Sequence, residues 1–316
     1  MKKIVIFGGG TGLSQLLKGL KLFPVDVTAI VTVADSGRST GKLRSELNIP
    51  AVGDISKVLL SMSNTDDDIM ELMNYRFPAG KELESHSIKN LILAALLDTK
   101  GDFKHAIPVL EKLLNIKGRV LPITEENVNL VGIMDDGSKV IGEENVTYAN
   151  KNIISLEYDK DVSISSDIAK AIKTADLIIF SSGSLLTSII PNLLVKGITD
   201  EIKASKAKKM YVCNLVTQPG ETNDFKASDH IKLLEKFLGN GVIDVILAND
   251  GKISDYIKKK YASLEQKDPV KLDESTLKRM NVSIIKDKIW KIEDNVLRHD
   301  SLKTAYLIFS YLMEGE

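Results

Sequence analysis

Glycines cluster at a turn near the start of the chain, where they suit the binding of a phosphate group. The turn consists of Gly8, Gly9, Gly10, Thr11 and Gly12. An apolar run at residues 4–7 precedes it, and leucines at helical spacing follow it. Glycine lets the backbone approach a ligand closely, and the free N–H groups at the start of a helix attract an anion. We therefore predict a phosphate-binding turn, with tight strand–helix packing as the alternative explanation.

This turn matches neither of two well-known phosphate-binding motifs. The lysine of GxxxxGK[ST] is absent, and Leu13 stands where GxGxxG requires its third glycine. Asp35 nevertheless ends the second apolar run, where a dinucleotide enzyme places the acid that binds ribose. A nicotinamide cofactor therefore remains an alternative.

Two aspartates follow polar turns further along the chain. Asp35 begins a turn that continues with Ser36 and Arg38, and its carboxylate could hold Mg²⁺ beside phosphates, bind a ribose or cap the turn. Asp54 follows Gly53 and precedes an apolar helical pattern, so we predict an N-cap first and a ligand contact second.

Polar side chains recur after the later apolar runs as well. They are Gly183, Ser184 and Thr187, then Asn214, Thr217 and Gln218, and finally Arg298 before the last helical pattern. Ligands of open parallel sheets bind beyond the carboxyl ends of the strands, so we expect these turns to share one rim. The Ser184 and Thr187 hydroxyls suit a second anionic group or a helix cap. Arg298 could bind a phosphate through two parallel hydrogen bonds.

His86 and Asn90 lie four residues apart, on one face of a predicted helix. This spacing lets both side chains reach the same ligand. A buried histidine beside a capped helix explains the spacing equally well. Neither the GxSxG motif nor a Cys/His set with metal-ligand spacing occurs in the sequence.

Short β-branched runs alternate with helical patterns along most of the chain. Runs at residues 4–7, 27–34, 177–180, 210–216 and 243–248 predict strands, and residues 55–62, 88–97, 166–174, 229–238 and 301–312 predict helices. This alternation predicts an α/β, Rossmann-like fold: a mostly parallel sheet with helices on both faces. We expect residues 1–316 to form a single nucleotide-binding domain. The sequence Asp135-Asp136-Gly137 predicts an antiparallel β-hairpin insertion at about residues 119–150.

The composition limits the compartment and the partners. Forty-two Lys and Arg residues nearly balance 43 Asp and Glu residues, which argues against nucleic-acid binding driven by overall charge. The one cysteine, Cys213, cannot form an internal disulfide and suits a reducing compartment. No apolar stretch has the length of a signal peptide or a membrane span. We expect a cytoplasmic protein.

An ordered set of motifs resembles the YvcK-type gluconeogenesis factor family, which belongs with the CofD-like 2-phospho-lactate transferases. The motifs are IVIFGGGTGLSQLLKGLK, TAIVTVADSG, STGKLR, GDISK, HSIKNLILAAL, GSLLTSIIPNLLV, NLVTQPGET, DHI and LRHD. The resemblance implies a Rossmann-like protein that binds a UDP-sugar and links gluconeogenic growth to cell-wall synthesis and cell shape. In the transferase relatives it implies Mg²⁺ at an acidic residue near Asp35. It also implies nucleotide contacts from residues 9–12, Asp35, Asn214, Thr217 and Gln218, and further ones from His86, Asn90, Gly183, Ser184 and Thr187.

The sequence departs from the family pattern at four positions. Arg38 interrupts a run of glycines, Ser85 and Lys89 replace glycines, and Leu186 replaces an aromatic residue. The two cations could bind a phosphate or narrow the pocket.

Three functions remain open. We favour a UDP-sugar-binding regulatory protein without turnover, because no nucleophile or acid–base pair stands out. The first alternative is a Mg²⁺-dependent phospholactate-type transferase with a nucleotide-linked donor, and the second is an NAD-dependent oxidoreductase. The apolar C-terminal helix suggests a homodimer, and the resemblance suggests cell-wall regulatory proteins as partners.

Overall fold

A seven-stranded sheet forms the centre of the molecule, and all its neighbouring strands are parallel. The computed structural model describes residues 1–80, 83–149, 151 and 153–314, without the side chains of Arg38 and Leu264. The strands are β1 (Lys2–Gly8), β2 (Val25–Val31), β3 (Arg119–Pro122), β7 (Leu177–Phe180), β8 (Lys208–Val212), β9 (Val245–Asn249) and β10 (Ser283–Asp287). The β-branched and aromatic residues of β1, β7, β8 and β9 are buried, as expected for strands covered on both faces, whereas Ile284 and Ile285 of the edge strand β10 are partly buried.

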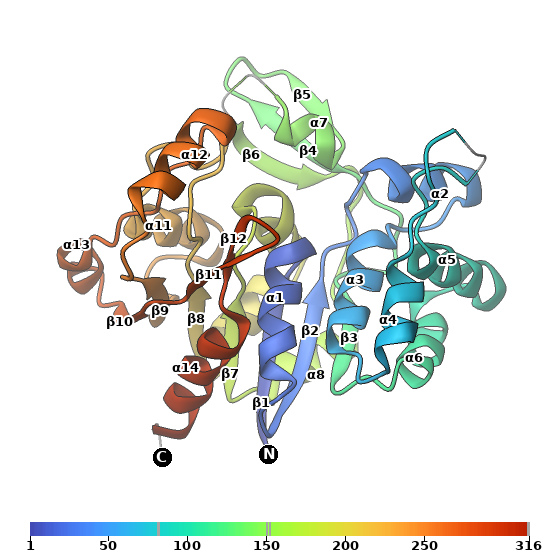
Figure 1. The fold of residues 1–316 in the computed structure, drawn as a ribbon, viewed down its shortest axis with the longest axis horizontal. Helices are drawn as coiled ribbons and strands as arrows, with labels where there is room; N and C mark the ends of the chain where they lie inside the picture. The colour runs from blue at the N-terminus through green and yellow to red at the C-terminus, as the bar shows by residue number, and fades with distance from the viewer. Residues whose placement is uncertain (81–82, 150, 152, 315–316) are drawn as a thin grey trace.

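The strand order is β10-β9-β8-β7-β1-β2-β3 (Figure 1). Starting from β1, the chain adds β2 and β3 on one side and then returns to add β7 to β10 on the other. The order therefore reverses between β1 and β7. In open α/β sheets this reversal leaves a crevice beyond the carboxyl ends of the two strands, because their crossover connections run in opposite directions. The predicted Rossmann-like fold is confirmed.

Helices cover both faces of the sheet (Figure 1). One group contains α1 (Gly10–Leu20), α2 (Arg38–Leu47), α3 (Gly53–Met62), α4 (Asp67–Asn74), α5 (Ile88–Lys100), α6 (Phe103–Leu113) and α14 (Ser301–Glu314). The other contains α8 (Ser166–Lys173), the π-helix η1 (Leu185–Ile189), α9 (Ile190–Leu193), α10 (Ile198–Ala204), α11 (Ala227–Leu238) and α13 (Glu274–Arg279). Gly19 lets α14 touch α1 directly, since an added Cβ would overlap the carbonyl of Ser301.

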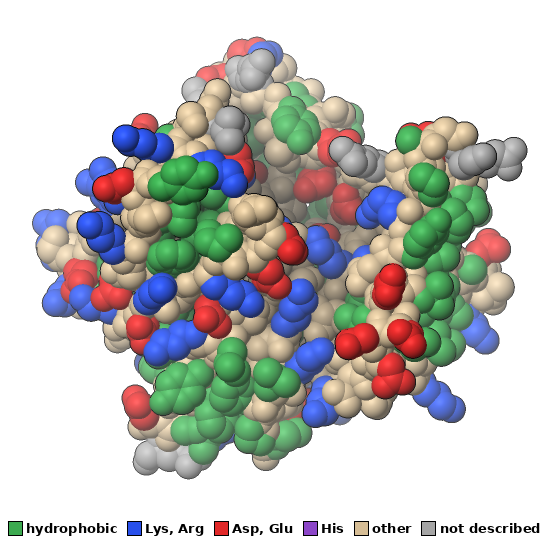
Figure 2. Space-filling view, viewed as in Figure 1, with side chains coloured by type: hydrophobic (Ala, Val, Ile, Leu, Met, Phe, Trp, Pro, Cys, Tyr) green, Lys and Arg blue, Asp and Glu red, His purple; other side chains and the backbone are tan. Residues whose placement is uncertain are grey.

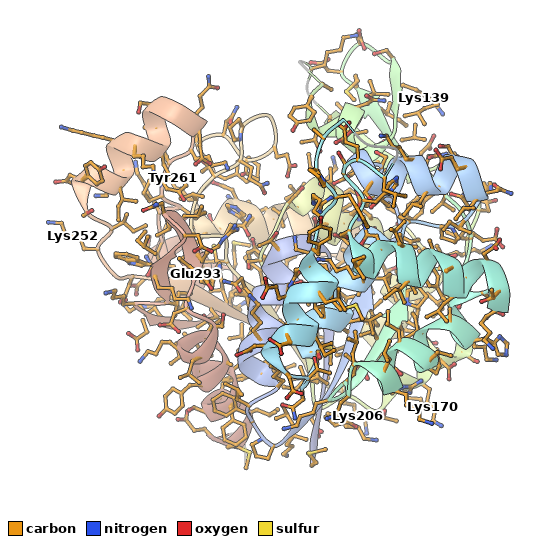
Figure 3. All side chains as sticks on the ribbon, turned by 45° about the vertical axis from the view of Figure 1, so that its right-hand side comes forward. Lys139, Lys170, Lys206, Lys252, Tyr261 and Glu293 are labelled. Atoms are coloured by element: carbon orange, nitrogen blue, oxygen red, sulfur yellow. The ribbon has the colours of Figure 1, made fainter. Side chains whose placement is uncertain are left out.

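A small antiparallel sheet lies above the carboxyl rim of the large one. It contains β4 (Leu130–Met134), β5 (Lys139–Ile141) and β6 (Ile153–Tyr158) in the order β5-β4-β6, together with α7 (Glu143–Thr147). In Figure 3, Lys139 marks this sheet, whereas Lys206, before β8, lies at the opposite end of the molecule.

The predicted hairpin turn is present, but the predicted limits of 119–150 are wrong at both ends. Residues 119–122 form β3, which pairs with β2 in the large sheet. The third strand of the small sheet, β6, begins only at Ile153. Strand pairing between distant segments set these limits, and the short apolar runs do not show which partner each one will have.

Two elements near the C-terminus complete the rim. The lysine-rich stretch after β9 forms α12 (Asp255–Glu265), and β11 (Trp290–Glu293) pairs with β12 (Val296–His299) in a hairpin that the sequence analysis missed. Its turn residues Asp294 and Asn295 both have positive φ, at 51° and 60°, as a tight hairpin turn requires. Within the described part of the chain, helices are too short or too polar to cross a membrane.

Candidate ligand-binding cleft

A cleft of about 410 Å³ lies at the point where the strand order reverses. The turns after β1 and β7 line it, together with the loop after β8, α7 of the small sheet, α12 and β12. In Figure 2 both Lys/Arg and Asp/Glu side chains gather around the hollow between α12, the small sheet and α2. Predicted residues that line the cleft are Gly9, Thr11, Gly12, Gly183, Ser184, Thr187, Asn214, Gln218 and Arg298.

The glycine turn brings the backbone of α1 against both the cleft and the neighbouring strand. Gly9 is the N-cap of α1, and Gly10 has a φ of +57°, which only glycine adopts readily. A Cβ on Gly12 would overlap the carbonyl oxygen of Ser182 in the turn after β7. Gly12 therefore allows the turn to pack tightly against the turn after β7, whereas Gly10 allows the backbone conformation that leaves room for a ligand.

A carboxylate of the protein itself lies at the start of α1. Asp54 accepts a hydrogen bond from the backbone N–H of Gly10, and its carboxyl group lies close to Gly9. Burial, reinforced by the nearby Asp35, raises the pKa of Asp54 to about 7. The prediction of an N-cap is wrong, because Val52 holds the N-cap position of α3 and Asp54 lies inside the first turn. Asp54 therefore competes with an incoming phosphate unless it is protonated or bridged by a cation.

Asp35 caps its own turn and lies beside the start of α3. Its Oδ1 accepts a hydrogen bond from Gly37 N at 2.9 Å, and its Oδ2 lies close to Gly53. Arg44 of α2 donates to the carbonyl oxygens of Asp35, at 3.2 Å, and of Val128, at 2.7 Å. This arginine therefore ties the turn to the segment that leads into the small sheet.

The pair Asp35 and Asp54 fits a Mg²⁺ ion only in part. Among the described residues, no group of three or more His, Cys, Asp or Glu side chains is arranged to hold a metal. Mg²⁺ commonly takes one or two carboxylates and completes its shell with water and substrate phosphates. The two carboxylates could thus hold Mg²⁺ together with a phosphorylated ligand.

Two cations lie beside the glycine turn. Lys57 of α3 donates a hydrogen bond from Nζ to Thr11 Oγ1 at 2.6 Å. Arg298 of β12 lines the cleft and lies near enough to Lys57 to lower its pKa, although burial lowers that pKa more. Arg298 was predicted and Lys57 was missed. The signal was available, since Lys57 follows Asp54 by three residues and so lies on the same face of a helix.

A chain of hydroxyl groups crosses the other side of the cleft. Ser184 Oγ donates to both carboxyl oxygens of Glu221, at 2.7 and 2.8 Å, and accepts from Thr187 Oγ1 at 2.7 Å. Thr187 in turn is hydrogen-bonded to Glu143 of α7. The prediction of a second anion here is not supported, because Glu221 already contacts Ser184 and the N–H groups of Leu185 and Leu186.

Both carboxyl groups in this chain are partly buried and hold protons more tightly than usual. Burial, with the charges of Asp35 and Asp54, raises the pKa of Glu143 to about 8, and burial also raises the pKa of Glu221. If Glu143 carries a proton, it can donate to Thr187, Thr187 donates to Ser184, and Ser184 donates to Glu221. Each of these hydroxyl groups then donates to its next neighbour. Neither glutamate was predicted. Glu221 lies in the motif NLVTQPGET but was not singled out from it, and Glu143 belongs to none of the motifs.

Several predicted residues hold loops in place. Asn214 exchanges two hydrogen bonds of 2.8 Å with the backbone of Gly183. Thr217 exchanges two with the backbone of Asp268, at 2.8 and 2.9 Å. Ser36 Oγ accepts from Glu144 N at 3.2 Å, which joins the turn after β2 to α7. Gln218 lines the cleft, and its buried Oε1 has no hydrogen-bond partner among the described residues. Of these side chains, Gln218 is the one best placed to accept from a ligand.

His86 and Asn90 lie behind the cleft in a buried polar cluster. His86 precedes α5, so the two residues do not share a helical face. Ser39 Oγ lies 3.0 Å from His86 Nδ1 and accepts from Asn90 Nδ2 at 3.3 Å. Asn90 Oδ1 accepts from Ser56 Oγ at 2.6 Å. These contacts join α2, α3 and α5 and so hold the segments that carry Asp35 and Asp54, while a ligand contact by His86 and Asn90 stays a prediction.

The four residues that depart from the family pattern lie in different surroundings. Ser85 has a φ of +69°, a conformation that glycine adopts more easily. Lys89 donates to Asn74 Oδ1 of α4 at 2.7 Å and is not among the residues that line the cleft. Leu186 is buried. Arg38 begins α2, and its side chain lies outside the part that the structure describes.

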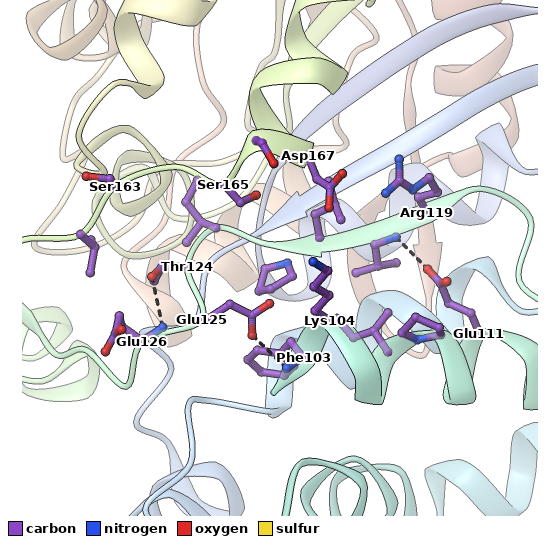
Figure 4. A pocket seen from close by; sticks show the side chains of 18 of the residues that line it. Phe103, Lys104, Glu111, Arg119, Thr124, Glu125, Glu126, Ser163, Ser165 and Asp167 are labelled. Carbon is purple, nitrogen blue, oxygen red and sulfur yellow. Dashed lines mark hydrogen bonds between the residues drawn. The ribbon is translucent and has the colours of Figure 1, made fainter. Parts of the chain in front are cut away.

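A second cavity, of about 420 Å³, lies at the open edge of β3 (Figure 4). Its carboxyl groups satisfy exposed ends of the secondary structure: Glu111 accepts from Val120 N at 3.1 Å, and Glu125 accepts from Phe103 N at 2.9 Å. Pro122 has no N–H to offer at this edge. We therefore assign these groups to protecting the sheet edge and the start of α6.

The fold and the cleft define a class: a Rossmann-like α/β protein with a polar cleft at the topological switch point. The sequence model of the family described as 2-phospho-L-lactate transferase CofD matches residues 4–290. The chain therefore belongs to this family, and the resemblance drawn from its motifs is confirmed.

Relatives match over nearly the whole length. The chain is 46% identical over 313 residues to the gluconeogenesis factor of Bacillus subtilis, covering 99% of this chain and 98% of that protein. It is 39% identical to the gluconeogenesis factor of Listeria innocua, covering 98% and 95%. A crystal structure of a Bacillus halodurans protein has a TM-score of 0.93 and 45% identity, and the match covers 98% of this chain and 99% of that one.

Proposed function

We propose that this protein binds a UDP-sugar in the cleft and acts as a regulatory protein without turnover. The observation that carries the proposal is the pairing of the glycine turn with Lys57 and Arg298 at the switch point. Backbone N–H groups and two cations together suit a diphosphate, because charge-assisted hydrogen bonds to phosphate are strong. The family supports a nucleotide-type ligand.

The absence of turnover is argued from Cys213, the one cysteine of the chain, and from His299, which lines the cleft. Burial raises the pKa of Cys213 to about 12, so its thiolate is not available as a nucleophile. Burial lowers the pKa of His299 to about 4, and its Nε2 lies 3.0 Å from the carbonyl oxygen of Cys213. Because this contact requires the proton on Nε2, His299 is held as a neutral structural group. Neither residue suits covalent or acid–base catalysis.

The relatives named gluconeogenesis factor support a role for this chain in gluconeogenic growth. A protein that binds a UDP-sugar without consuming it would report the supply of activated sugar for cell-wall synthesis. We therefore extend the role to a link between carbon metabolism, cell-wall synthesis and cell shape, exercised in the cytoplasm through regulatory protein partners.

A Mg²⁺-dependent transferase of a phosphorus-containing group is the second candidate, favoured by the family description and by Asp35 beside Asp54. These two carboxylates would hold the ion, which would neutralise charge on a phosphodiester donor. Lys57 and Arg298 would orient the donor's phosphates. The NAD-dependent alternative has less support, because Leu13 packs in the core where the third glycine would stand.

The test is calorimetric titration of the purified protein with UDP-N-acetylglucosamine, GDP and NAD, each with and without Mg²⁺. The proposal expects selective binding of the UDP-sugar and recovery of the ligand unchanged. Preference for GDP with Mg²⁺, or conversion of the ligand, would favour the transferase. Preference for NAD would overturn the proposal.

A homodimer through α14 remains a prediction. Leu302 and Tyr306 of this helix are 56% and 52% exposed, which leaves apolar surface for a second copy. Light scattering of the wild-type protein and of Tyr306→Glu measures the mass in solution. A wild-type dimer that the variant breaks into monomers would support the prediction, and a wild-type monomer would reject it.

A further inference from the structure

The cleft has two chemically different sides. The first carries the glycine turn with Lys57 and Arg298. The second carries Glu143 and Glu221, connected through Thr187 and Ser184. We call the four residues of the second side the acidic wall. Its members come from α7, from the loop after β8 and from η1, so three separate elements build it.

The acidic wall offers hydrogen bonds that suit hydroxyl groups. A carboxylate accepts at about four lone-pair positions, and the contacts of Glu143 with Thr187 and the backbone N–H of Ser36 leave some of those unused. Glu221 accepts from Ser184 and from the N–H groups of Leu185 and Leu186, so it has less capacity left for a ligand. Glu143 and Glu221 both line the cleft, so a bound molecule can reach them. Gln218, which lines the same cleft, adds a buried acceptor oxygen without a partner among the described residues. Acceptors therefore predominate on this side, and they require donors from the ligand.

When its carboxyl groups are ionised, the same wall disfavours a negatively charged group. Two like charges that lie a few ångströms apart in a partly buried site repel each other strongly, because little water screens them. A phosphate or carboxylate is therefore better placed beside Lys57 and Arg298 than beside Glu143 and Glu221. The difference in charge between the two sides of the cleft therefore determines the orientation of a ligand that has one anionic end and one neutral end.

We propose that the acidic wall selects the sugar end of the ligand, accepting a neutral sugar through its hydroxyl groups and rejecting a sugar that carries a carboxylate. The inference rests on the proposed function, because it assumes that a UDP-sugar occupies the cleft. It adds a specificity that the family match does not contain, and it assigns that specificity to Glu143 and Glu221.

The probes are UDP, UDP-glucose and UDP-glucuronate. The last two differ only at C6, where a hydroxymethyl group is replaced by a carboxylate. Titrations of the full chain at pH 8.5, above the pKa of about 8 of Glu143, keep the carboxyl group of Glu143 mostly ionised. The variants are Glu143→Gln and Glu221→Gln, which keep the shape and remove the charge. Glu157→Gln is the matched control, because Glu157 pairs with Lys139 on the surface of the small sheet.

We expect the wild-type protein and Glu157→Gln to bind UDP-glucose about tenfold or more tightly than UDP-glucuronate. In Glu143→Gln and Glu221→Gln this ratio falls toward one. The affinity for UDP is measured in each variant, so that the ratio reports the sugar end alone. If Glu221→Gln fails to fold by circular dichroism, Glu143→Gln decides the result.

Two results would overturn the inference alone: a wild-type ratio near one, or a wild-type ratio that persists in the glutamine variants, each with normal binding of UDP. Failure of the wild-type protein to bind UDP would instead reject the proposed function, and the inference with it.

Discussion

The ammonium group of Lys57 lies 2.6 Å from the hydroxyl oxygen of Thr11, and this contact joins α3 to the glycine turn. Asp54, three residues earlier on the same helix, accepts a hydrogen bond from Gly10 in that turn. One helix thus presents both a cation and a carboxylate to the backbone groups that suit a phosphate. Asp54 lowers the affinity of this site for an anion, whereas Lys57 raises it. We therefore expect that the affinity for a phosphorylated ligand would depend on the ionisation of Asp54 and on divalent cations.

Arg298→Ala is expected to weaken UDP binding by about 1.5–3 kcal/mol, the usual loss for a hydrogen bond to a charged group. Arg298 lines the cleft close to Lys57, where a diphosphate would lie. Calorimetric titration with UDP measures the change. Arg279→Ala is the control, because Arg279 is exposed on α13. Equal affinities in all three proteins would place Arg298 outside the site.

Two glycine substitutions separate packing from ligand binding. A Cβ at position 12 overlaps the backbone of Ser182, so we expect Gly12→Ala to lower the free energy of unfolding by about 1–3 kcal/mol. A Cβ on Gly10 would be in ordinary contact with the carboxyl group of Asp54, but Gly10 has a positive φ, so Gly10→Ala should cost about 1–2 kcal/mol and leave the fold intact. Urea unfolding compares the two. A bulkier residue, as in Gly10→Leu, should abolish UDP binding, and retained affinity would contradict the phosphate-binding turn.

Asp35→Asn is expected to remove any dependence of UDP binding on Mg²⁺. The carboxylate lies beside Asp54, and the loss of one of the two weakens an ion held between them and the phosphates. Titration of the wild-type protein and the variant with and without Mg²⁺ provides the comparison. Identical isotherms in all four experiments would leave Asp35 with its turn-capping contact to Gly37 alone.

Stability should fall between pH 6.5 and 8 in the absence of divalent cations. Asp54 and Glu143 have pKa values of about 7 and 8 in the folded protein, above the ordinary values of 3.8 and 4.5. The folded state therefore binds more protons than the unfolded state in this range, and the free energy of unfolding falls as pH rises. His299, with a pKa lowered to about 4 from 6.5, affects stability below this range.

Thermal unfolding across this pH range checks the expectation. Asp54→Asn and Glu143→Gln should each flatten the decline in Tm, because the neutral amides cannot ionise. Glu157→Gln serves again as the surface control. A wild-type Tm that stays constant, or the same slope in all variants, would show that both carboxyl groups ionise normally.

His86→Ala is expected to lower the free energy of unfolding by about 1–3 kcal/mol, because it removes a partner of the buried hydroxyl of Ser39. A double-mutant cycle with Ser39→Ala should show coupling between the two positions. His105→Ala is the control, since His105 is exposed and pairs with Asp102 at the surface. Stability equal to that of the wild-type protein would mean that His86 is not part of the supporting cluster.

Much of the fold could be predicted from the sequence, because strand and helix periodicity is local. The buried segments of β1, β7 and β9, at residues 4–7, 177–180 and 245–248, lack polar residues, and the leucines of α1 recur at helical spacing. Elements with weaker periodicity were missed. The hairpin of β11 and β12 consists of two four-residue strands, and its signal in the sequence is the dipeptide Asp294-Asn295, two residue types that tolerate positive φ.

The site divides in the same way. Residue type and spacing determined the glycine turn, the aspartates and the family, because these depend on neighbours in the chain and on the order of motifs. The pairing of β1 with β7 decided which turns share a cleft. Packing of the small sheet brought Glu143 toward Thr187, and the loop after β8 brought Glu221 toward Ser184. Sequence spacing carries no information about such contacts, since they form only when distant segments pack together and lose water. The tertiary structure alone therefore decided that the cleft has a cationic side and an acidic side.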